Sequence, residues 1–407
     1  MPVFKTVFAR SSKVLLKQVQ ALTLPSSSSL LFAISTNTEP VVLSSLVSYL
    51  GQDKNCIGCL ASSPAQTSYS CAVAAFPNSL AVPFRSTIPG ASPISLGKLR
   101  RPVDPTAKGN QGGTQFDHLD DSSWKDLGTK GFPWGSVFDG PSTRHSLPEG
   151  LEHIPKGDIK NMIYFSDGAP EGLKASLDSY FPAAAKMGLV ASSTPFVTGR
   201  PFTLLEGNKV WSDGAVGLAL LNSVPKLSHS FYGYEAFSKP YTVSSAESNL
   251  IHSLDNRNPV KELLSASSSI QGGLPGGGIN ASKDIDVYLG TLVDGSDTYQ
   301  RIYQVSSGGP TKGILALNSE SGPSVGTKVQ FLYRPQDTMY NDPHSTPNRP
   351  SLQFSSSSED TSHASDDEQE YKVTDSFFAS SENGLVLSSS LGSWVSSVPG
   401  AKSSFNW

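Results

Sequence analysis

The residues best suited to chemistry include three cysteines, Cys56, Cys59 and Cys71, which lie in one short stretch. The Cys56-x-x-Cys59 pair could form half of a zinc site or a redox dithiol. No second Cys-x-x-Cys or Cys-x-x-His follows at the required spacing, and the pair lies in a predicted strand where a redox motif would begin a helix. We therefore interpret the cysteines as buried residues near the end of a strand. Their small, odd number is typical of a reducing compartment.

Two serine-rich turns are the stronger candidates for binding. Short apolar runs end in similar sequences, Ala-Ser-Ser-Pro at 61–64 and Ala-Ser-Ser-Thr-Pro at 191–195. Parallel sheets keep their ligand crevice at the carboxyl ends of the strands, so both turns become candidate walls of one pocket, where Arg200 would meet an acidic group of the ligand. The predicted ligand-binding residues are Gly58, Cys59, Ser62, Ser63, Ser192, Ser193 and Arg200.

The familiar catalytic motifs are absent from the sequence, which has no Gly-x-Ser-x-Gly elbow, His-Glu-x-x-His pair or Walker loop. The glycine-rich residues 272–278 could cradle a phosphate but lack a following Lys-Ser/Thr, so a linker is the better interpretation. Asp117-His118 could bind a metal, and His229 or His252 could ligate haem, but solvated loop acids and ordinary surface or core histidines are the better interpretation. We therefore predict no catalytic residue, metal or cofactor, while an unrecognised hydrolase or transferase stays open.

Length and composition limit the classes of protein. A chain of 407 residues is long enough for two packed domains or one large domain. The formal net charge of -4 provides no overall attraction to polyanions, so we expect no nucleic-acid partner. No run approaches the roughly 18 apolar residues that a membrane-spanning helix needs.

The elements that must position the two serine turns form two similar β-α-β units, which we interpret as an internal duplication in an α/β sheet domain. Each unit consists of a short apolar strand, an amphipathic helix and a second apolar strand that leads into one serine turn. The first unit comprises residues 30–35, 41–50 and 56–60, and the second comprises residues 162–166, 171–180 and 188–191.

The first domain is expected to span residues 12–224, with a Gly/Pro-rich insertion at about 89–155. A hairpin around Gly207-Asn208 and a buried strand at 215–221 would complete this domain. The second domain, 225–338, is strand-rich and therefore closer to α+β. Residues 339–372 are acidic, serine-rich and without periodicity, which predicts a disordered loop, and residues 373–407 would end the second domain.

The N-terminal residues are basic and free of acids, and the apolar residues Phe4, Phe8, Leu15, Val19 and Leu22 recur at helical spacing. A basic amphipathic helix of this kind is typical of a mitochondrial targeting segment, which we place at residues 1–11. The alternative is a cytoplasmic protein in which this stretch begins the fold.

Several motifs occur in an order that resembles the FIST domain, in both its N-terminal and C-terminal halves. The matching motifs are Gly58-Cys59, the Gly-Ala-Val-Gly strand at 214–217, the Ile-x-x-Leu-Asp-x-x-x-Pro turn at 251–259, and the strands at 313–317 and 326–331. The similarity extends from about residue 12 to 338 and resumes loosely after 372. The chain departs from the family pattern in its acidic insert, in lacking the closing Gly-Glu-Ile-Gly strand and in lacking an F-box, so it resembles a stand-alone eukaryotic member.

This resemblance implies sensing of a small molecule in signalling proteins, or recruitment of substrates to ubiquitin ligases, without catalysis. The first expectation is therefore a sensory module that binds a small molecule such as an acidic metabolite in the crevice of the two β-α-β units. The alternative is an adaptor that contacts a protein partner through the insertion at 89–155 or the acidic loop. Neither expectation involves nucleic acid or a membrane span.

Overall fold

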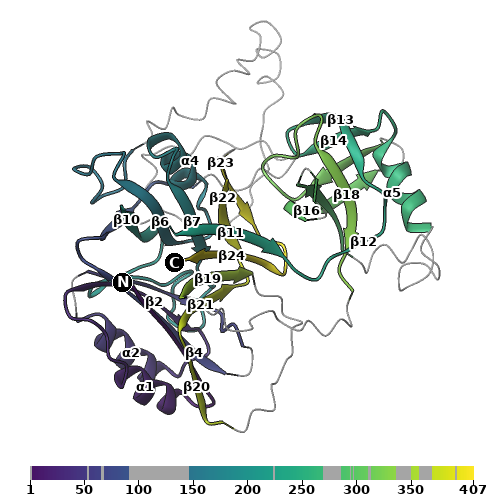
Figure 1. The fold of residues 1–407 in the computed structure, drawn as a ribbon. Coiled ribbons are helices and arrows are strands. Elements are labelled where there is room, and N and C mark those ends of the chain that lie inside the picture. Colours follow the sequence, from purple (N-terminus) through teal and green to yellow (C-terminus); the bar gives the residue numbers. More distant parts are fainter. Residues whose placement is uncertain are drawn as a thin grey trace, which may run out of the picture. The chain divides into compact units, whose positions relative to one another are not determined.

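The structure is a computed structural model. It describes residues 2–52, 55–65, 68–90, 146–222, 225–268, 286–293, 295–296, 298–309, 313–335, 350–356, 369–389 and 392–407. Nearly all of these residues belong to one compact unit, made of Met1–Pro93 and Leu147–Trp407. The described part is rich in strands and contains four helices, α1, α2, α4 and α5 (Figure 1). A mixed α/β fold agrees with the sequence prediction.

The first β-α-β unit lies in a seven-stranded sheet with the order β20-β1-β4-β2-β3-β8-β9. Its β2 and β3 strands pair in parallel and are joined through helix α2. Helix α2 (Pro40–Leu50) begins at a proline, and helix α1 (Ser12–Gln20) begins at Ser11, whose side chain accepts a hydrogen bond from the Val14 N–H. The strands are β20 (Tyr371–Thr374), β1 (Val3–Ala9), β4 (Tyr69–Pro77), β2 (Ser28–Ser35), β3 (Cys56–Ala61), β8 (Leu204–Glu206) and β9 (Lys209–Trp211).

The second β-α-β unit lies in a six-stranded sheet with the order β23-β22-β7-β6-β10-β5. Here β6 and β7 pair in parallel and are joined through helix α4 (Glu171–Tyr180). Both predicted β-α-β units are thus present, each with one parallel pair. The strands are β23 (Gly392–Ser396), β22 (Leu385–Ser389), β7 (Ala185–Val190), β6 (Ile159–Ser166), β10 (Ala215–Leu221) and β5 (Ala81–Ser86).

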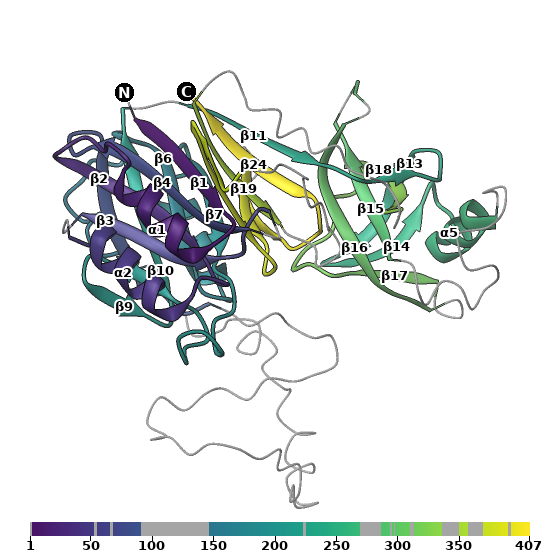
Figure 2. The same cartoon turned by 90° about the horizontal axis from the view of Figure 1, so that it is seen from below.

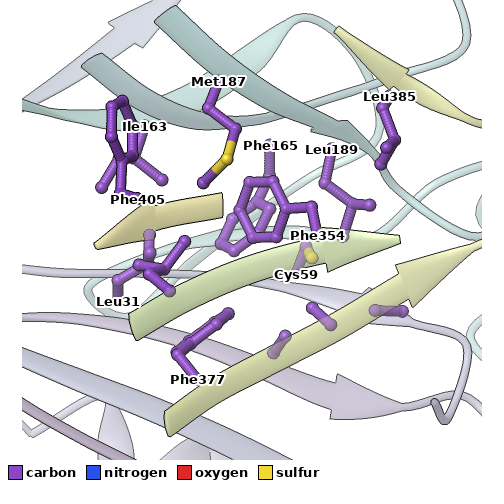
Figure 3. Close-up of a cluster of buried hydrophobic side chains, with 14 of the residues drawn as sticks. Leu31, Cys59, Ile163, Phe165, Met187, Leu189, Phe354, Phe377, Leu385 and Phe405 are labelled. Carbon is purple, nitrogen blue, oxygen red and sulfur yellow. The ribbon is translucent and has the colours of Figure 1, made fainter. Parts of the chain in front are cut away.

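A large apolar cluster joins the inner faces of these sheets, while their outer faces carry the helices. Side chains such as Leu31 from the first sheet and Phe165 from the second lie in this cluster together with Phe354 and Phe377 (Figure 3). A second cluster packs α1 and α2 against the first sheet, and a third packs α4 against the second. Because both faces of each parallel pair are buried, their strands read as continuous apolar runs.

A four-stranded sheet with the order β11-β24-β19-β21 contributes Phe354 and Phe377 to that cluster. Its strands are β11 (Lys226–Phe231), β24 (Ala401–Asn406), β19 (Ser351–Ser356) and β21 (Ser376–Ser381). The prediction of disorder over 339–372 is wrong for β19, where Leu352 and Phe354 are fully buried. This strand was missed because the buried Leu352 and Phe354 alternate with the polar residues Ser351, Gln353 and Ser355 in a serine-rich stretch.

The remaining strands close into a barrel, because the order β12-β18-β13-β14-β17-β16-β15 carries an additional β18–β15 pairing (Figure 2). An apolar cluster that includes Val243, Leu289 and Phe331 belongs to these strands. Helix α5 (Pro259–Ser268) contacts β14 and β17, and its first N–H groups are capped by the Asn258 side chain. The strands are β12 (Glu235–Ala236), β18 (Lys328–Tyr333), β13 (Tyr241–Glu247), β14 (Leu250–Leu254), β17 (Ile314–Leu317), β16 (Tyr299–Gly309) and β15 (Val287–Leu292).

The ends of the chain differ from the sequence expectations. Residues 3–9 form strand β1 instead of the start of a helix, and Phe4 and Val7 are buried in the apolar clusters on the two faces of the first sheet. Residues 371–406 were expected to end the second domain, yet β20 pairs with β1 and β22 pairs with β7. The last strands therefore complete the two sheets that carry the β-α-β units, and the barrel is built from residues between them.

Candidate functional site

The ends of two parallel strands bring the serine turns together. Strand β3 ends at Ala61, directly before Ser62, and β7 ends at Val190, shortly before Ser192. The Ser192 N–H donates to the Leu60 carbonyl at 3.1 Å, which fastens the second turn to the first strand. The Ser62 Oγ and Ser192 Oγ atoms lie 3.0 Å apart. Two turns that are far apart in the chain thus meet at one point.

A third segment supplies a carboxylate to this point. Glu382 lies on the turn between β21 and β22, and its Oε2 accepts hydrogen bonds from Ser62 Oγ at 2.6 Å and from Ser192 Oγ at 2.7 Å. Its Oε1 accepts from the Ser193 backbone N–H at 2.8 Å and from Asn383 Nδ2 at 3.2 Å. We refer to Ser62, Ser192, Ser193, Glu382 and Asn383 as the serine–glutamate cluster.

The hydrogen bonds hold Glu382 in its ionised form. Partial burial raises the pKa of this carboxyl, but the bonds from Ser62, Ser193 and Ser192 outweigh the burial and bring the pKa below its usual range. Each serine hydroxyl has one proton, so both protons are directed at the carboxylate and neither serine donates to the other. With its pKa lowered, Glu382 acts in this cluster as a hydrogen-bond acceptor.

The predicted residues Ser63 and Arg200 lie outside this cluster. The Ser63 hydroxyl donates to the Ala65 carbonyl at 2.8 Å and accepts from the Ala65 N–H, which closes a local turn. The Arg200 Nη1 donates to Ser212 Oγ at 2.7 Å, so the guanidinium is engaged with the residue that follows β9. Both residues flank the cluster in sequence without joining its hydrogen-bond network.

Gly58 and Cys59 belong to the core, not to the serine–glutamate cluster. A β-carbon at Gly58 would lie 2.4 Å from the ring of Phe32, so only glycine allows β2 and β3 to pack here. Cys59 is fully buried among apolar side chains, and this burial raises the pKa of its thiol well above the ordinary value (Figure 3). Residues in the middle of β3 are enclosed by a core on each face, whereas only the turn after the strand reaches the surface.

A second group of polar residues joins the barrel to helix α4 and strand β23. The Arg301 guanidinium lies 4.4 Å from the ring centre of Tyr303 and 5.4 Å from that of Trp394, and its Nη2 donates to Ser319 Oγ at 2.6 Å. Burial lowers the pKa of Arg301, although the neighbouring Tyr303 and Glu320 oppose this shift. The Arg301 side chain thus contacts Tyr303 and Ser319 and also Trp394 of β23.

Helix α4 contributes an acid to this second group. Burial, together with the nearby charges of Glu320 and Asp167, raises the pKa of Glu171, while its own helix N-terminus and Lys174 lower it. Lys174 also forms an ion pair with Glu320 of the barrel. The sequence offered no signal for this group, because its members come from three distant parts of the chain.

The described residues contain no group of three or more His, Cys, Asp or Glu side chains placed to hold a metal. Both ring nitrogens of His229 are engaged, one 2.8 Å from the Ser388 carbonyl and one 3.0 Å from Ser403 Oγ, so it has no ring nitrogen left for haem. Residues 272–278 and Asp117-His118 lie outside the described ranges. No helix in the described part is long and apolar enough to span a membrane.

The chain matches a known protein family. The family model described as the FIST N domain matches residues 29–257, more than half of the chain. The matched range contains both serine turns and both β-α-β units, but it excludes Glu382. A comparison with curated proteins finds no match.

Proposed function

Since the chain belongs to the FIST family, we propose that it is a sensory protein that binds a small molecule at the serine–glutamate cluster. FIST domains are associated with sensory or signalling roles. The observation that carries this proposal is the convergence of Ser62, Ser192 and Ser193 on one point at the ends of β3 and β7. Convergent polar groups at the carboxyl ends of parallel strands are the usual ligand-binding arrangement of α/β proteins.

The cluster is partly exposed, which would allow a small molecule to bind and dissociate. Ser192 is buried, while Ser193 and Glu382 are exposed, so the site opens to solvent on one side. Its donors are two hydroxyls, one backbone N–H and the Asn383 amide, which would orient a ligand without a covalent step. The family assignment and this geometry point to recognition and not to turnover.

The proposal is tested by incubating the purified full chain with a metabolite extract, removing unbound material by gel filtration and identifying retained compounds by mass spectrometry. We expect the wild type to retain at least one small molecule that Ser62→Ala/Ser192→Ala does not retain. The matched control is Ser228→Ala/Ser404→Ala, because these hydroxyls lie 2.8 Å apart on another, exposed sheet position. Equal retention by all three proteins, or by none of them, would refute the site.

A second function, that of a protein-interaction adaptor, is favoured by Phe196. This ring is fully exposed, although the surrounding loop is fastened by Thr194, Thr198 and Thr203, whose hydroxyls lie 2.7–3.4 Å from one another. An aromatic side chain held in solvent by an ordered loop is typical of an interaction anchor. Phe196→Ser should abolish partner capture in a pull-down while leaving the retained metabolite unchanged; undiminished capture would exclude this role for Phe196.

We also propose a mitochondrial location, supported by the basic residues Arg10, Lys13 and Lys17, all of which are exposed. Because β1 is part of a sheet, the import machinery would have to recognise the targeting segment without cleavage of residues 3–9. The test is a fluorescent fusion of the full chain beside Arg10→Gln/Lys13→Gln/Lys17→Gln. A mitochondrial signal only in the first supports the address, and the same cytoplasmic distribution in both refutes it.

A further inference from the structure

We propose that the serine–glutamate cluster is a carboxylate-binding site and that Glu382 occupies it as a built-in stand-in for the carboxylate of the ligand. This inference rests on the proposed function, since it uses the same site, and it adds the chemical class of the ligand and a means of signalling. Three segments of the chain contribute: two supply the serine donors, and the third supplies Glu382 and the Asn383 amide.

The donors match a planar carboxylate in number and placement. One carboxylate oxygen accepts from the two hydroxyls of Ser62 and Ser192, and the other accepts from the Ser193 N–H and the Asn383 amide. All four donors are neutral, whereas proteins usually bind phosphate with arginine or lysine. A monoanionic carboxylate is therefore the group that this set of donors recognises.

The donors keep their positions independently of Glu382. The Ser62 N–H donates to the Ser380 carbonyl at 2.8 Å, and the Ser380 hydroxyl donates back to the Ser62 carbonyl at 3.0 Å. Ser192 is fastened through its N–H to Leu60, as described above, and Asn383 Nδ2 also donates to the Ala191 carbonyl at 2.8 Å. Withdrawal of the Glu382 side chain would therefore leave an organised set of donors without an acceptor, and this is the condition under which a free carboxylate binds.

Glu382 is placed so that it can leave. It is an exposed turn residue between β21 and β22, and its side chain can rotate into solvent without moving the buried strands on either side. A ligand carboxylate that takes its place would release the link between this turn and Ser62, Ser192 and Ser193. The turn joins two different sheets, so its release converts occupancy of the site into a change in local order.

The test is chemical rescue of Glu382→Ala by acetate, followed by denaturant unfolding of the full chain against an equal concentration of sodium chloride. At roughly ten times its Kd, acetate should raise the folding constant of Glu382→Ala about 11-fold. It should have little effect on Glu382→Gln, whose amide still fills the site, or on Glu382→Ala/Ser62→Ala/Ser192→Ala, which lacks the hydroxyl donors. Absence of rescue in folded Glu382→Ala overturns the inference.

If Glu382→Ala does not fold, hydrogen exchange of the wild type decides the question. Acetate, but not chloride, should speed exchange in the peptide that contains residues 381–384, and unchanged exchange at saturating acetate overturns the inference. The experiments distinguish failure of the proposed ligand site from failure of the proposed carboxylate class. A metabolite that depends on Ser62 and Ser192 without any acetate effect would keep the site and reject the carboxylate class, whereas no serine-dependent metabolite would reject the site itself.

Discussion

Phe4→Ala should strongly destabilise the protein, because strand β1 is a structural part of the sheet. The Phe4 side chain is 3% exposed, and its ring centre lies 4.7 Å from that of Trp407 and 5.8 Å from that of Phe76. Replacing a buried phenylalanine by alanine costs about 3–5 kcal/mol through lost burial and the cavity that remains. We therefore expect the free energy of unfolding to fall by about 3–5 kcal/mol.

Phe196→Ala is the matched control, since it makes the same chemical change at a fully exposed position. Its expected effect is within about 0.5 kcal/mol of zero. Both variants and the wild type are unfolded in urea and followed by far-ultraviolet circular dichroism and tryptophan fluorescence at one protein concentration. A loss of under about 1 kcal/mol for Phe4→Ala would show that residues 3–9 are not integral to the sheet, and would refute the assignment of β1 to the core.

Three further substitutions test packing, a buried charge and a titrating group. Gly58→Ala should cost about 1–3 kcal/mol of stability, because its β-carbon meets a phenyl ring, whereas Gly157→Ala, with no atom within 4 Å of the added carbon, should be neutral; equal effects in urea melts would contradict this. Lys186→Met should cost about 1–3 kcal/mol by breaking a 3.0 Å ion pair with Asp178, and an unchanged urea midpoint would show that the pair contributes nothing. Glu382→Gln should destabilise the protein most at neutral pH, because the pKa of Glu382 is lowered in the folded protein. The carboxylate therefore contributes its full stabilisation above the pKa of the unfolded chain, about 4.3, and loses it as the pH falls through the folded-state pKa. Urea midpoints at pH 7, 5 and 3 measure this difference, and a gap that stays constant with pH would count against it.

Local sequence patterns were sufficient to predict elements that are buried on both faces or that end at a recognisable turn or cap. Residues 171–180 and 215–221 were predicted with the bounds of α4 and β10, and Gly207, with a φ of 54°, turns the predicted hairpin between β8 and β9. Strand β1 was missed because Phe4 and Phe8 fall at helical spacing with the apolar residues of α1, and a single helix explained both segments. Spacing alone does not show where one element ends and another begins.

The residues of the serine–glutamate cluster were predicted only where they follow a recognisable strand. Ser62 and Ser192 could be found because a parallel strand pair directs its ends to one edge of a sheet. Glu382 could not, because the Ser62–Glu382 hydrogen bond joins residues 320 positions apart, and no local property of a Glu-Asn-Gly turn reveals its partner. Gly58 and Cys59, in the interior of β3, were predicted as pocket residues because they lie close to the turn in sequence. Closeness to a turn does not tell which residues of the strand are buried in the core.

The pairing of β1 with β20 sets an order for folding during synthesis. Strand β1 is made before β20, and in their antiparallel pairing Thr6 lies opposite Thr374, a residue 368 positions later in the chain. Until that partner leaves the ribosome, one edge of β1 has unpaired backbone groups and is prone to incorrect pairing. Among the described residues, the barrel strands between Glu235 and Tyr333 pair with one another and with no strand outside the barrel, so they can form earlier. A nascent chain should therefore carry a finished barrel beside two unfinished sheets, and its dependence on chaperones should end only when the last strands emerge.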